Sequence, residues 1–256
     1  MTDRWAQGVD FERANAARIY DYFLGGAQHF AVDREQAARI LELNPDMTRT
    51  CRVNRDYLRR VVRWCSDRGI DQFLDLGSGV PTVGNVHEVA PTARVVYVDF
   101  EPVAVHHARA LTADLDRVRV VHADLTLPDD VLEAAAEHLD LTRPVAVLAV
   151  AVLHFVADDV AAVLGCYRDA LVPGSVLAIS HGSADLDDPD LAARTRAIRD
   201  GYRGSASEVV LRDRGELAQA VEGFELVTPV MVDVADWPAP TGERPVGAYA
   251  VVGLRT

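Results

Sequence analysis

From Ile70 onward, short apolar runs alternate with amphipathic segments of helical length. Five of the apolar runs are predicted to be β-strands, at residues 72–77, 94–99, 117–124, 144–155 and 174–181. Helices are predicted between them, at residues 102–114, 129–139 and 158–171. Alternation of this kind indicates a parallel sheet with helices on both faces, and nearly continuous apolar strands are typical of such a covered sheet.

The N-terminal part has a different pattern, because apolar residues recur at helical spacing through much of residues 10–69. Asn44-Pro45 is expected to begin a long helix, as its N-cap and first-turn proline, and Gly69 is expected to end it. A second stripe on this helix is basic and consists of Arg52, Arg55, Arg59 and Arg63. The stripe is expected to be a solvated surface, and contact with an anionic substrate is the alternative.

After residue 182 the alternation becomes less regular. Helices are expected at residues 189–202 and 213–221, followed by a closing pair of strands at residues 224–234 and 247–255. The chain is therefore expected to have two parts, a helical N-terminal extension over residues 1–69 and an α/β domain over residues 70–256.

Polar residues stand at the carboxyl ends of all five predicted parallel strands. The first strand ends in Asp75-Leu76-Gly77-Ser78-Gly79, where the glycines allow a sharp turn and the close approach of a ligand. The second ends in Asp99, which can accept hydrogen bonds from the hydroxyls of a ribose. Asp124 follows the third strand, where its carboxylate can accept a hydrogen bond from an adenine amino group. His154 and His181 end the fourth and fifth strands.

Two classes of ligand fit such a crevice, a nicotinamide dinucleotide and S-adenosylmethionine. The dinucleotide fingerprint G-x-G-x-x-G needs a third glycine before a helix that binds pyrophosphate, and Thr82 stands at that position. The three aspartates also suit a ligand with a sulfonium and an amino group and no phosphate. S-adenosylmethionine is therefore favoured, and an NAD(P)-dependent oxidoreductase is the alternative.

The segment Asn15-Ala-Ala-Arg18-Ile-Tyr20-Asp21-Tyr22-Phe-Leu24-Gly25-Gly26 resembles the signature of an actinobacterial family of Rossmann-fold S-adenosylmethionine-dependent methyltransferases. Further motifs that match the family lie at residues 73–82, 84–88, 95–102, 122–125, 152–155 and 173–181. The resemblance covers residues 11–185. It implies a Rossmann-like class I methyltransferase sheet of seven strands, of which the last is antiparallel.

The resemblance also implies where the cofactor, S-adenosyl-L-methionine, is bound. The expected contacts are the glycine motif, an acidic residue at the ribose, an acidic residue near the adenine and the residues that adjoin them: Asp75, Gly77, Ser78, Gly79, Asp99, Phe100, Asp124 and Leu125.

The N-terminal signature is expected to contribute a lid over the methionine end of the cofactor. Its residues with this expected role are Arg18, Tyr20, Tyr22, Gly25 and Gly26. Polar groups at a glycine hinge can close over a ligand and exclude water. The alternative is a helix that ends at Gly25-Gly26 and packs its tyrosines.

Composition limits the possible partners. The net charge of −13 disfavours binding to phosphate backbones, so no nucleic-acid partner is expected. The absence of lysine excludes Schiff-base and P-loop chemistry. No His, Cys or carboxylate cluster has ligand spacing, so no metal is expected. The longest apolar run, Val145–Val152, is far shorter than the roughly 20 residues that span a bilayer, and a cytoplasmic protein without membrane contact is expected.

Methyl transfer is an in-line displacement, so the protein mainly has to hold the acceptor in line. A hydroxyl or amine acceptor can also need a base, and His154 and His181 are the candidate catalytic residues. The expected substrate is a small molecule that is methylated on oxygen or nitrogen. The alternative is a non-catalytic protein that holds S-adenosylmethionine as a sensor or structural ligand.

Overall fold

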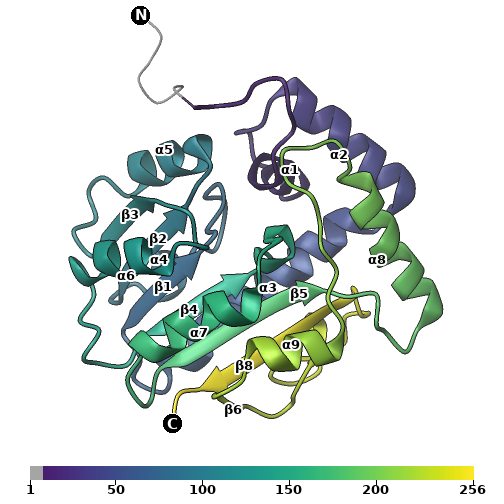
Figure 1. The fold of residues 1–256 in the computed structure, drawn as a ribbon. Helices are drawn as coiled ribbons and strands as arrows, with labels where there is room; N and C mark the ends of the chain where they lie inside the picture. The colour runs from purple at the N-terminus through teal and green to yellow at the C-terminus, as the bar shows by residue number, and fades with distance from the viewer. Residues whose placement is uncertain (1–7) are drawn as a thin grey trace, which may run out of the picture.

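An eight-stranded sheet lies at the centre of the fold, which the computed structural model describes for residues 8–256 (Figure 1). The strands are β1 (Gln72–Leu76), β2 (Arg94–Asp99), β3 (Val118–His122), β4 (Ala146–Val150), β5 (Val176–Gly182), β6 (Glu225–Leu226), β7 (Val232–Asp233) and β8 (Ala248–Leu254). Their order is β3-β2-β1-β4-β5-β8-β6, and β7 also pairs with β8. The first five strands pair in parallel and β8 is antiparallel to β5, which confirms the predicted fold class.

The sheet has one strand more than the seven expected. The single strand expected at residues 224–234 is divided into two short strands, β6 and β7. β6 and β7 each pair with β8 over two residues, and Pro229 lies between them. Proline has no N–H to donate to a sheet, so the hydrogen bonding to β8 is interrupted there. Met231 in the same connection has a positive φ of 50°, which also departs from strand geometry.

Helices cover both faces of the sheet. They are α1 (Ala16–Phe23), α2 (Ala31–Leu43), α3 (Met47–Ser66), α4 (Val86–Val89), α5 (Pro102–Leu111), α6 (Pro128–Ala136), α7 (Val160–Ala170), α8 (Pro189–Gly201) and α9 (Arg214–Ala220). One buried cluster joins α3, α4 and α5 to the sheet, and a second joins α6, α7 and α9 to the opposite face. No helix within residues 8–256 is long and apolar enough to cross a membrane.

The long helix α3 begins later than the sequence indicated. Its N-cap is Asp46, and Asn44 instead ends α2, with an extended backbone of φ −140° and ψ 94°. The reason is steric, because the residue before a proline is pushed out of the helical region. Gly69, with a φ of +81°, follows the end of α3 as expected.

The N-terminal helices pack against each other and not against a face of the sheet. A third apolar cluster joins α1, α2 and the start of α3 to Tyr202, directly after α8. Figure 1 shows α1, α2 and α8 together at one side of the molecule, beyond the sheet. The remainder of α3 belongs to the sheet's own core, so this one helix contributes to both apolar clusters.

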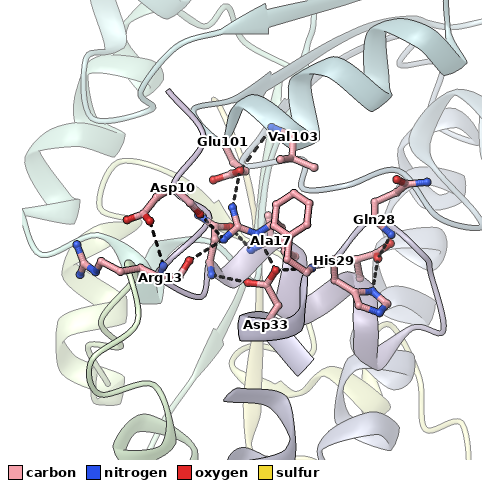
Figure 2. Close-up of polar contacts among 12 residues, drawn as sticks. Asp10, Arg13, Ala17, Gln28, His29, Asp33, Glu101 and Val103 are labelled. Carbon is pink, nitrogen blue, oxygen red and sulfur yellow. Dashed lines mark hydrogen bonds and ion pairs between the residues drawn. The ribbon is translucent and has the colours of Figure 1, made fainter. Parts of the chain in front are cut away.

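Arg18 connects the N-terminal segment to the sheet, and its two ion-pair partners, Asp33 and Glu101, are labelled in Figure 2. Arg18 in α1 is fully buried, and its Nε donates to Asp33 Oδ2 of α2 at 2.8 Å. Its Nη1 donates to Glu101 Oε1 at 2.9 Å, and Glu101 is the N-cap of α5 directly after β2. Its Nη2 donates to the carbonyl oxygens of Asp10 and Arg13 at 3.0 and 2.7 Å. Arg18 thus fixes α1 and α2 above the carboxyl end of β2.

We predict that Arg18→Met destabilises the fold strongly, because it leaves the carboxylates of Asp33 and Glu101 buried without their cation. Breaking a buried ion pair from one side costs about 3–5 kcal/mol. The free energy of unfolding in urea should fall by that amount, whereas Arg196→Met on the exposed face of α8 should change it by less than about 0.5 kcal/mol. A loss below about 1 kcal/mol for Arg18→Met would contradict the role given to this residue.

Candidate active site

A first cavity, of about 870 Å³, opens at the carboxyl ends of β1, β2 and β4. Its floor is formed by the loops that follow these strands and by the loop after β3. Its roof comes from α1 and α3, through side chains that include Tyr20, Asn54 and Arg55. A cavity therefore lies at the carboxyl edge of the sheet, where the sequence places the site, and α1 and α3 line it on the side away from the strands.

The glycine motif forms the part of the floor next to β1. Gly77 and Gly79 have positive φ values of +65° and +68°, which favour glycine. A side chain at Gly77 would also collide with Val152 across the cavity floor. The backbone N–H groups of Gly77 and Ser78 donate to the Val98 carbonyl at 2.8 and 3.1 Å, so the loop is tied to β2.

Asp99 stands at the end of β2 in the first cavity and is 7% exposed. Its Oδ2 accepts a hydrogen bond from Gly79 N at 2.7 Å, and its Oδ1 accepts one from Glu101 N at 2.9 Å. Burial raises the pKa of Asp99, and the backbone N–H donors oppose that rise. Each oxygen has a further lone pair, so the carboxylate can still accept hydrogen bonds from a ribose.

Asp75 at the end of β1 has a more strongly perturbed carboxyl group. Burial raises its pKa to about 7, and the charge of Asp99 adds to the effect while that of Arg55 opposes it. Asp75 and Arg55 both line the first cavity.

A second cavity, of about 670 Å³, adjoins the first. Tyr20, Asn54, Ala151 and Phe155 line both cavities and form the wall between them. The rest of the second cavity comes from the start of α3, the end of β5, α8 and the chain before β8. None of the described residues that line it is an arginine, lysine, aspartate or glutamate.

A chain of buried and partly buried hydrogen bonds fixes the wall. Asn54 Nδ2 donates to Tyr20 Oη at 3.0 Å, and Tyr20 Oη donates to the Cys51 carbonyl at 3.0 Å. Ser180 Oγ donates to Asn54 Oδ1 at 2.6 Å and accepts from Ala151 N at 2.9 Å. Ala151 has a positive φ of 57°, a conformation that costs a non-glycine residue about 1–3 kcal/mol. The hydrogen bond from Ala151 N helps to hold this strained residue at the junction of the two cavities.

Sequence reasoning missed Asn54 and Ser180. The available signal was position, since Asn54 lies three residues after Cys51 and four before Leu58, on the apolar stripe of α3. A polar residue on a buried stripe requires a partner. Its partner Ser180 directly precedes His181 at the end of β5, but only the fold shows that these two residues face each other.

His154 and His181 both line the second cavity, and their rings are 5.5 Å apart between centroids. Both nitrogens of His181 are engaged: Nδ1 donates to the Gly182 carbonyl at 2.8 Å, and Nε2 accepts from Arg212 Nη1 at 3.2 Å. Burial lowers the pKa of His181 to about 4 and that of His154 to about 3, and Arg212 lowers both further. His154 Nδ1 is buried with no hydrogen-bond partner among the described residues. His154 is therefore the imidazole that retains hydrogen-bonding capacity.

The other predicted residues occupy different places. Tyr20, Phe100 and Leu125 line the first cavity with the glycine motif. Arg18 and Tyr22 do not line it: Arg18 belongs to the ion-pair network above, and Tyr22 packs edge-on against Phe23 and His29. Gly25 and Gly26 follow the C-cap of α1, and their N–H groups donate to the carbonyls of Tyr22 and Asp21 in its last turn. Asp124 is exposed, accepts from Thr126 N at 2.9 Å, and lies beside the lining residues Ala123 and Leu125 without lining the cavity itself.

Residues 2–253 match the family described as S-adenosyl methyltransferase. The chain belongs to this family. It is similar to the crystal structure of a candidate methyltransferase from Thermobifida fusca YX, with 35% identity, 97% of each chain covered and a TM-score of 0.89. It is also similar to a DUF574 family protein from Streptomyces avermitilis MA-4680, with 34% identity, 96% of this chain and 99% of that chain covered, and a TM-score of 0.87.

More distant structures share the fold. Magnesium protoporphyrin IX methyltransferase from Synechocystis PCC 6803, with bound S-adenosylhomocysteine, covers 93% of this chain and 93% of its own at 13% identity and a TM-score of 0.56. No curated protein matches the chain. Family membership identifies S-adenosylmethionine as the cofactor, and not a nicotinamide dinucleotide. The first cavity fits this cofactor, because it presents a buried carboxyl group at each of β1 and β2 and a floor in which Gly77 and Gly79 allow a ligand to approach the backbone closely.

We predict that His154 and His181 stay neutral in the folded chain well below pH 6.5, the ordinary pKa of histidine. Between that value and their lowered pKa values, the unfolded chain binds protons that the folded chain excludes. The free energy of unfolding should therefore fall as the pH falls, by up to about 1.4 kcal/mol per pH unit for each imidazole. Asp75 acts in the opposite direction because its pKa is raised, so a variant is needed to isolate the histidines.

Urea unfolding measured at pH 7.5, 6.5 and 5.5 gives the free energy of unfolding at each pH. Its decrease from pH 7.5 to 5.5 should be smaller for His154→Gln than for the unsubstituted chain. Imidazole chemical shifts measured by NMR over the same range should stay constant for both residues. Titration of either ring with a midpoint near pH 6.5 would contradict the prediction.

Proposed function

We propose that the protein transfers a methyl group from S-adenosylmethionine to a small, uncharged, largely apolar acceptor held in the second cavity. The observation that carries this proposal is the shared wall of Tyr20, Asn54, Ala151 and Phe155. Two ligands, one in each cavity, would meet at the carboxyl end of β4, where the two cavities adjoin. A protein that only stored the cofactor would not need a second cavity against the first.

The first cavity would hold the cofactor through residues from four strand ends. Asp99 would accept hydrogen bonds from the ribose, and the loop Gly77–Gly79 would lie under the sugar and the chain beyond it. Phe100 and Leu125 would contact the adenine, with Asp124 at the rim beside it. S-adenosylmethionine supplies a methyl group on a sulfonium, which is already a good leaving group. The protein therefore needs mainly to align the acceptor and exclude water.

The second cavity would select the acceptor by charge and polarity. Its lining carries no formal charge, because both histidines are kept neutral and no other ionised side chain among the described residues reaches it. Placing a carboxylate or ammonium there without a counterion would be costly. Uncharged aromatic or alicyclic molecules with one hydroxyl, or with one aromatic amine, fit this lining.

His154 would orient the acceptor by accepting a hydrogen bond from its hydroxyl or amine. With a pKa lowered to about 3, the imidazole is a weak proton acceptor, so its main contribution is to position the nucleophile. Both ring nitrogens of His181 are occupied, by the Gly182 carbonyl and by Arg212. His181 would therefore pack against His154 and would not contact the hydroxyl or amine proton of the acceptor. The geometry thus favours His154 of the two candidates.

Cofactor binding is tested by titration calorimetry with S-adenosylhomocysteine. Asp99→Ala should weaken binding by about 1.5–3 kcal/mol, or roughly 10- to 150-fold, the usual loss of hydrogen bonds to a charged acceptor. The exposed Asp114→Ala, near the end of α5, should leave the affinity unchanged. Tighter binding of a nicotinamide dinucleotide than of S-adenosylhomocysteine would overturn the assignment.

Transfer is tested with a library of small phenols and aromatic amines, each paired with its carboxylated counterpart, by mass spectrometry of the methylated product. Only uncharged members should be methylated. Ile198→Trp, which fills the second cavity from α8, should lower the rate at least about tenfold while the affinity for S-adenosylhomocysteine changes less than about twofold. Methylation of the carboxylated members would refute the acceptor class, and no methylation at all would favour the non-catalytic alternative.

A further inference from the structure

Arg212 is a buried cation that forms no ion pair with the described residues. It is 8% exposed and lies at the end of the chain that joins α8 to α9 (Figure 1). Its Nη1 donates to the Leu153 carbonyl at 2.8 Å, and its Nη2 donates to the Val156 carbonyl at 2.7 Å. No carboxylate within residues 8–256 lies within 4.0 Å of its guanidinium. An arginine is always charged, so a buried one that is compensated only by neutral groups requires an explanation.

These hydrogen bonds hold the turn that carries His154. The turn is a short 3₁₀ helix, Leu153–Phe155, and its C-cap is Val156, so Arg212 binds a carbonyl near each end of it. Between them, the His154 carbonyl accepts a hydrogen bond from Val210 N at 2.8 Å. The turn belongs to the lining of the second cavity. The position of this part of the lining therefore depends on the chain at residues 210–212.

The same guanidinium determines which nitrogen of His181 carries the proton. Arg212 Nη1 lies 3.2 Å from His181 Nε2, and His181 Nδ1 lies 2.8 Å from the Gly182 carbonyl oxygen. A guanidinium can only donate and a carbonyl oxygen can only accept, so Nε2 must accept and Nδ1 must carry the hydrogen. A proton on Nε2 would set two N–H donors and two positive charges against each other. His181 is thereby held as the neutral Nδ1–H tautomer.

Burial and Arg212 act in the same direction on the two imidazoles. Burial is the larger cause of the lowered pKa of His181, about 4, and of His154, about 3, and the charge of Arg212 lowers both further. His181 itself also lowers the pKa of His154, and its ring stands nearly perpendicular to that of His154, at 83°. The acidic residues whose charges act on Arg212 are Asp159 and Glu216. A cation thus stands behind both rings, on the side away from the cavity that they line.

We propose that Arg212 is a positioning residue of the acceptor site, which fixes the turn that presents His154 to the second cavity and holds His181 beside it as the neutral Nδ1–H tautomer. Arg212 lines neither the first cavity nor the second, so it acts through the two histidines and touches no ligand. His154 then keeps a lone pair for the O–H or N–H of the acceptor, and the cavity stays uncharged. This inference rests on the proposed function where it concerns the acceptor, and the state of His181 can be tested without it.

Arginine suits this role because of its shape. One planar fork directs Nη1 to both the Leu153 carbonyl and His181 Nε2, and directs Nη2 to the Val156 carbonyl. Lysine keeps the charge and a donor but has no fork, and methionine keeps the length of the side chain with neither charge nor donor. The substitutions Arg212→Lys and Arg212→Met therefore separate charge and hydrogen bonding from packing.

NMR of the imidazole nitrogens tests the arrangement on the full chain, with no cofactor or acceptor added. A nitrogen that carries hydrogen and one that carries a lone pair differ in nitrogen-15 chemical shift, and His181→Gln identifies the signals. At pH 7.0 the unsubstituted protein should show His181 with hydrogen on Nδ1 and a lone pair on Nε2. Hydrogen on Nε2 of His181 would overturn the proposal without the need for any variant.

Arg212→Met should release His181 Nε2. The titration midpoint of His181 should rise by at least about one pH unit, the scale of a charge that acts across a few ångströms in a protein. Arg212→Lys should restore the midpoint to within about half a unit of the original, because it keeps the charge. Arg203→Met is the matched control, since Arg203 lies in the same connection with a side chain 75% exposed, and it should change neither signal. A loss of stability in Arg212→Met without any change in tautomer or midpoint would reduce Arg212 to a structural residue.

The rate of transfer gives the second readout, with any phenol of the library that is methylated. Arg212→Met should lower kcat/KM for that phenol at least about tenfold, because the turn and His154 lose their position. In a His154→Gln background the same substitution should lower it less than about threefold further, since Arg212 acts through His154. Equal losses in the two backgrounds would show that Arg212 does not act through His154.

The outcomes separate this inference from the proposed function. If no phenol is methylated, the proposed function fails and the acceptor role of Arg212 fails with it, whereas the NMR measurements still decide the state of His181. If transfer occurs but Arg212→Met leaves tautomer and midpoint unchanged, the inference is refuted and the proposed function stands. Should Arg212→Met not fold, the tautomer in the unsubstituted protein and the midpoint in Arg212→Lys still decide the question.

Discussion

The buried guanidinium of Arg18 is the interaction on which the site depends. It connects α1 to α2 through Asp33 and to the sheet through Glu101, two residues after Asp99. Without this connection, no ion pair described here would hold α1 over the carboxyl end of β2. The part of the roof that α1 contributes, including Tyr20, would then depend on the hydrogen bonds of Tyr20 to α3 and on apolar packing. A residue that does not line the cavity thus helps to hold its roof in place.

The two cavities differ in the way they treat charge. The first contains Asp75, Asp99, Glu101 and Arg55, and so suits a ligand with several polar and charged groups. The second excludes ionised side chains, and the buried Arg212 beside His181 helps to keep the imidazoles neutral. Between them lies the wall, whose polar side chains Tyr20 and Asn54 belong to one chain of hydrogen bonds from the Cys51 carbonyl to Ala151 N. Such a wall can position two ligands without moving.

The backbone of the site could be predicted because it depends on local patterns. The strand expected at residues 94–99 is β2 with the same bounds, and the glycines after β1 have the positive φ values that a sharp turn requires. The resemblance to a methyltransferase family was confirmed by the match over residues 2–253. The errors lay beside prolines: Pro45 moved the start of α3, and Pro229 divided the strand expected at residues 224–234. Each proline acts through its own geometry and its missing N–H.

The direction of side chains could not be predicted, because it depends on what packs against them. Four arginines at helical spacing look alike in the sequence, yet only the fold turns Arg55 inward and leaves Arg52 and Arg63 in solvent. Arg18 and Tyr20 lie two residues apart on α1, and Arg18 binds two buried carboxylates without lining the cavity, whereas Tyr20 forms its wall. The sequence by itself determined the alternation of strands and helices, the glycine turn and the acidic strand ends, since these follow from periodicity and backbone sterics. Tertiary structure decided which charges are paired, which imidazole is free and where two cavities meet, because those properties arise from contacts between segments far apart in the chain.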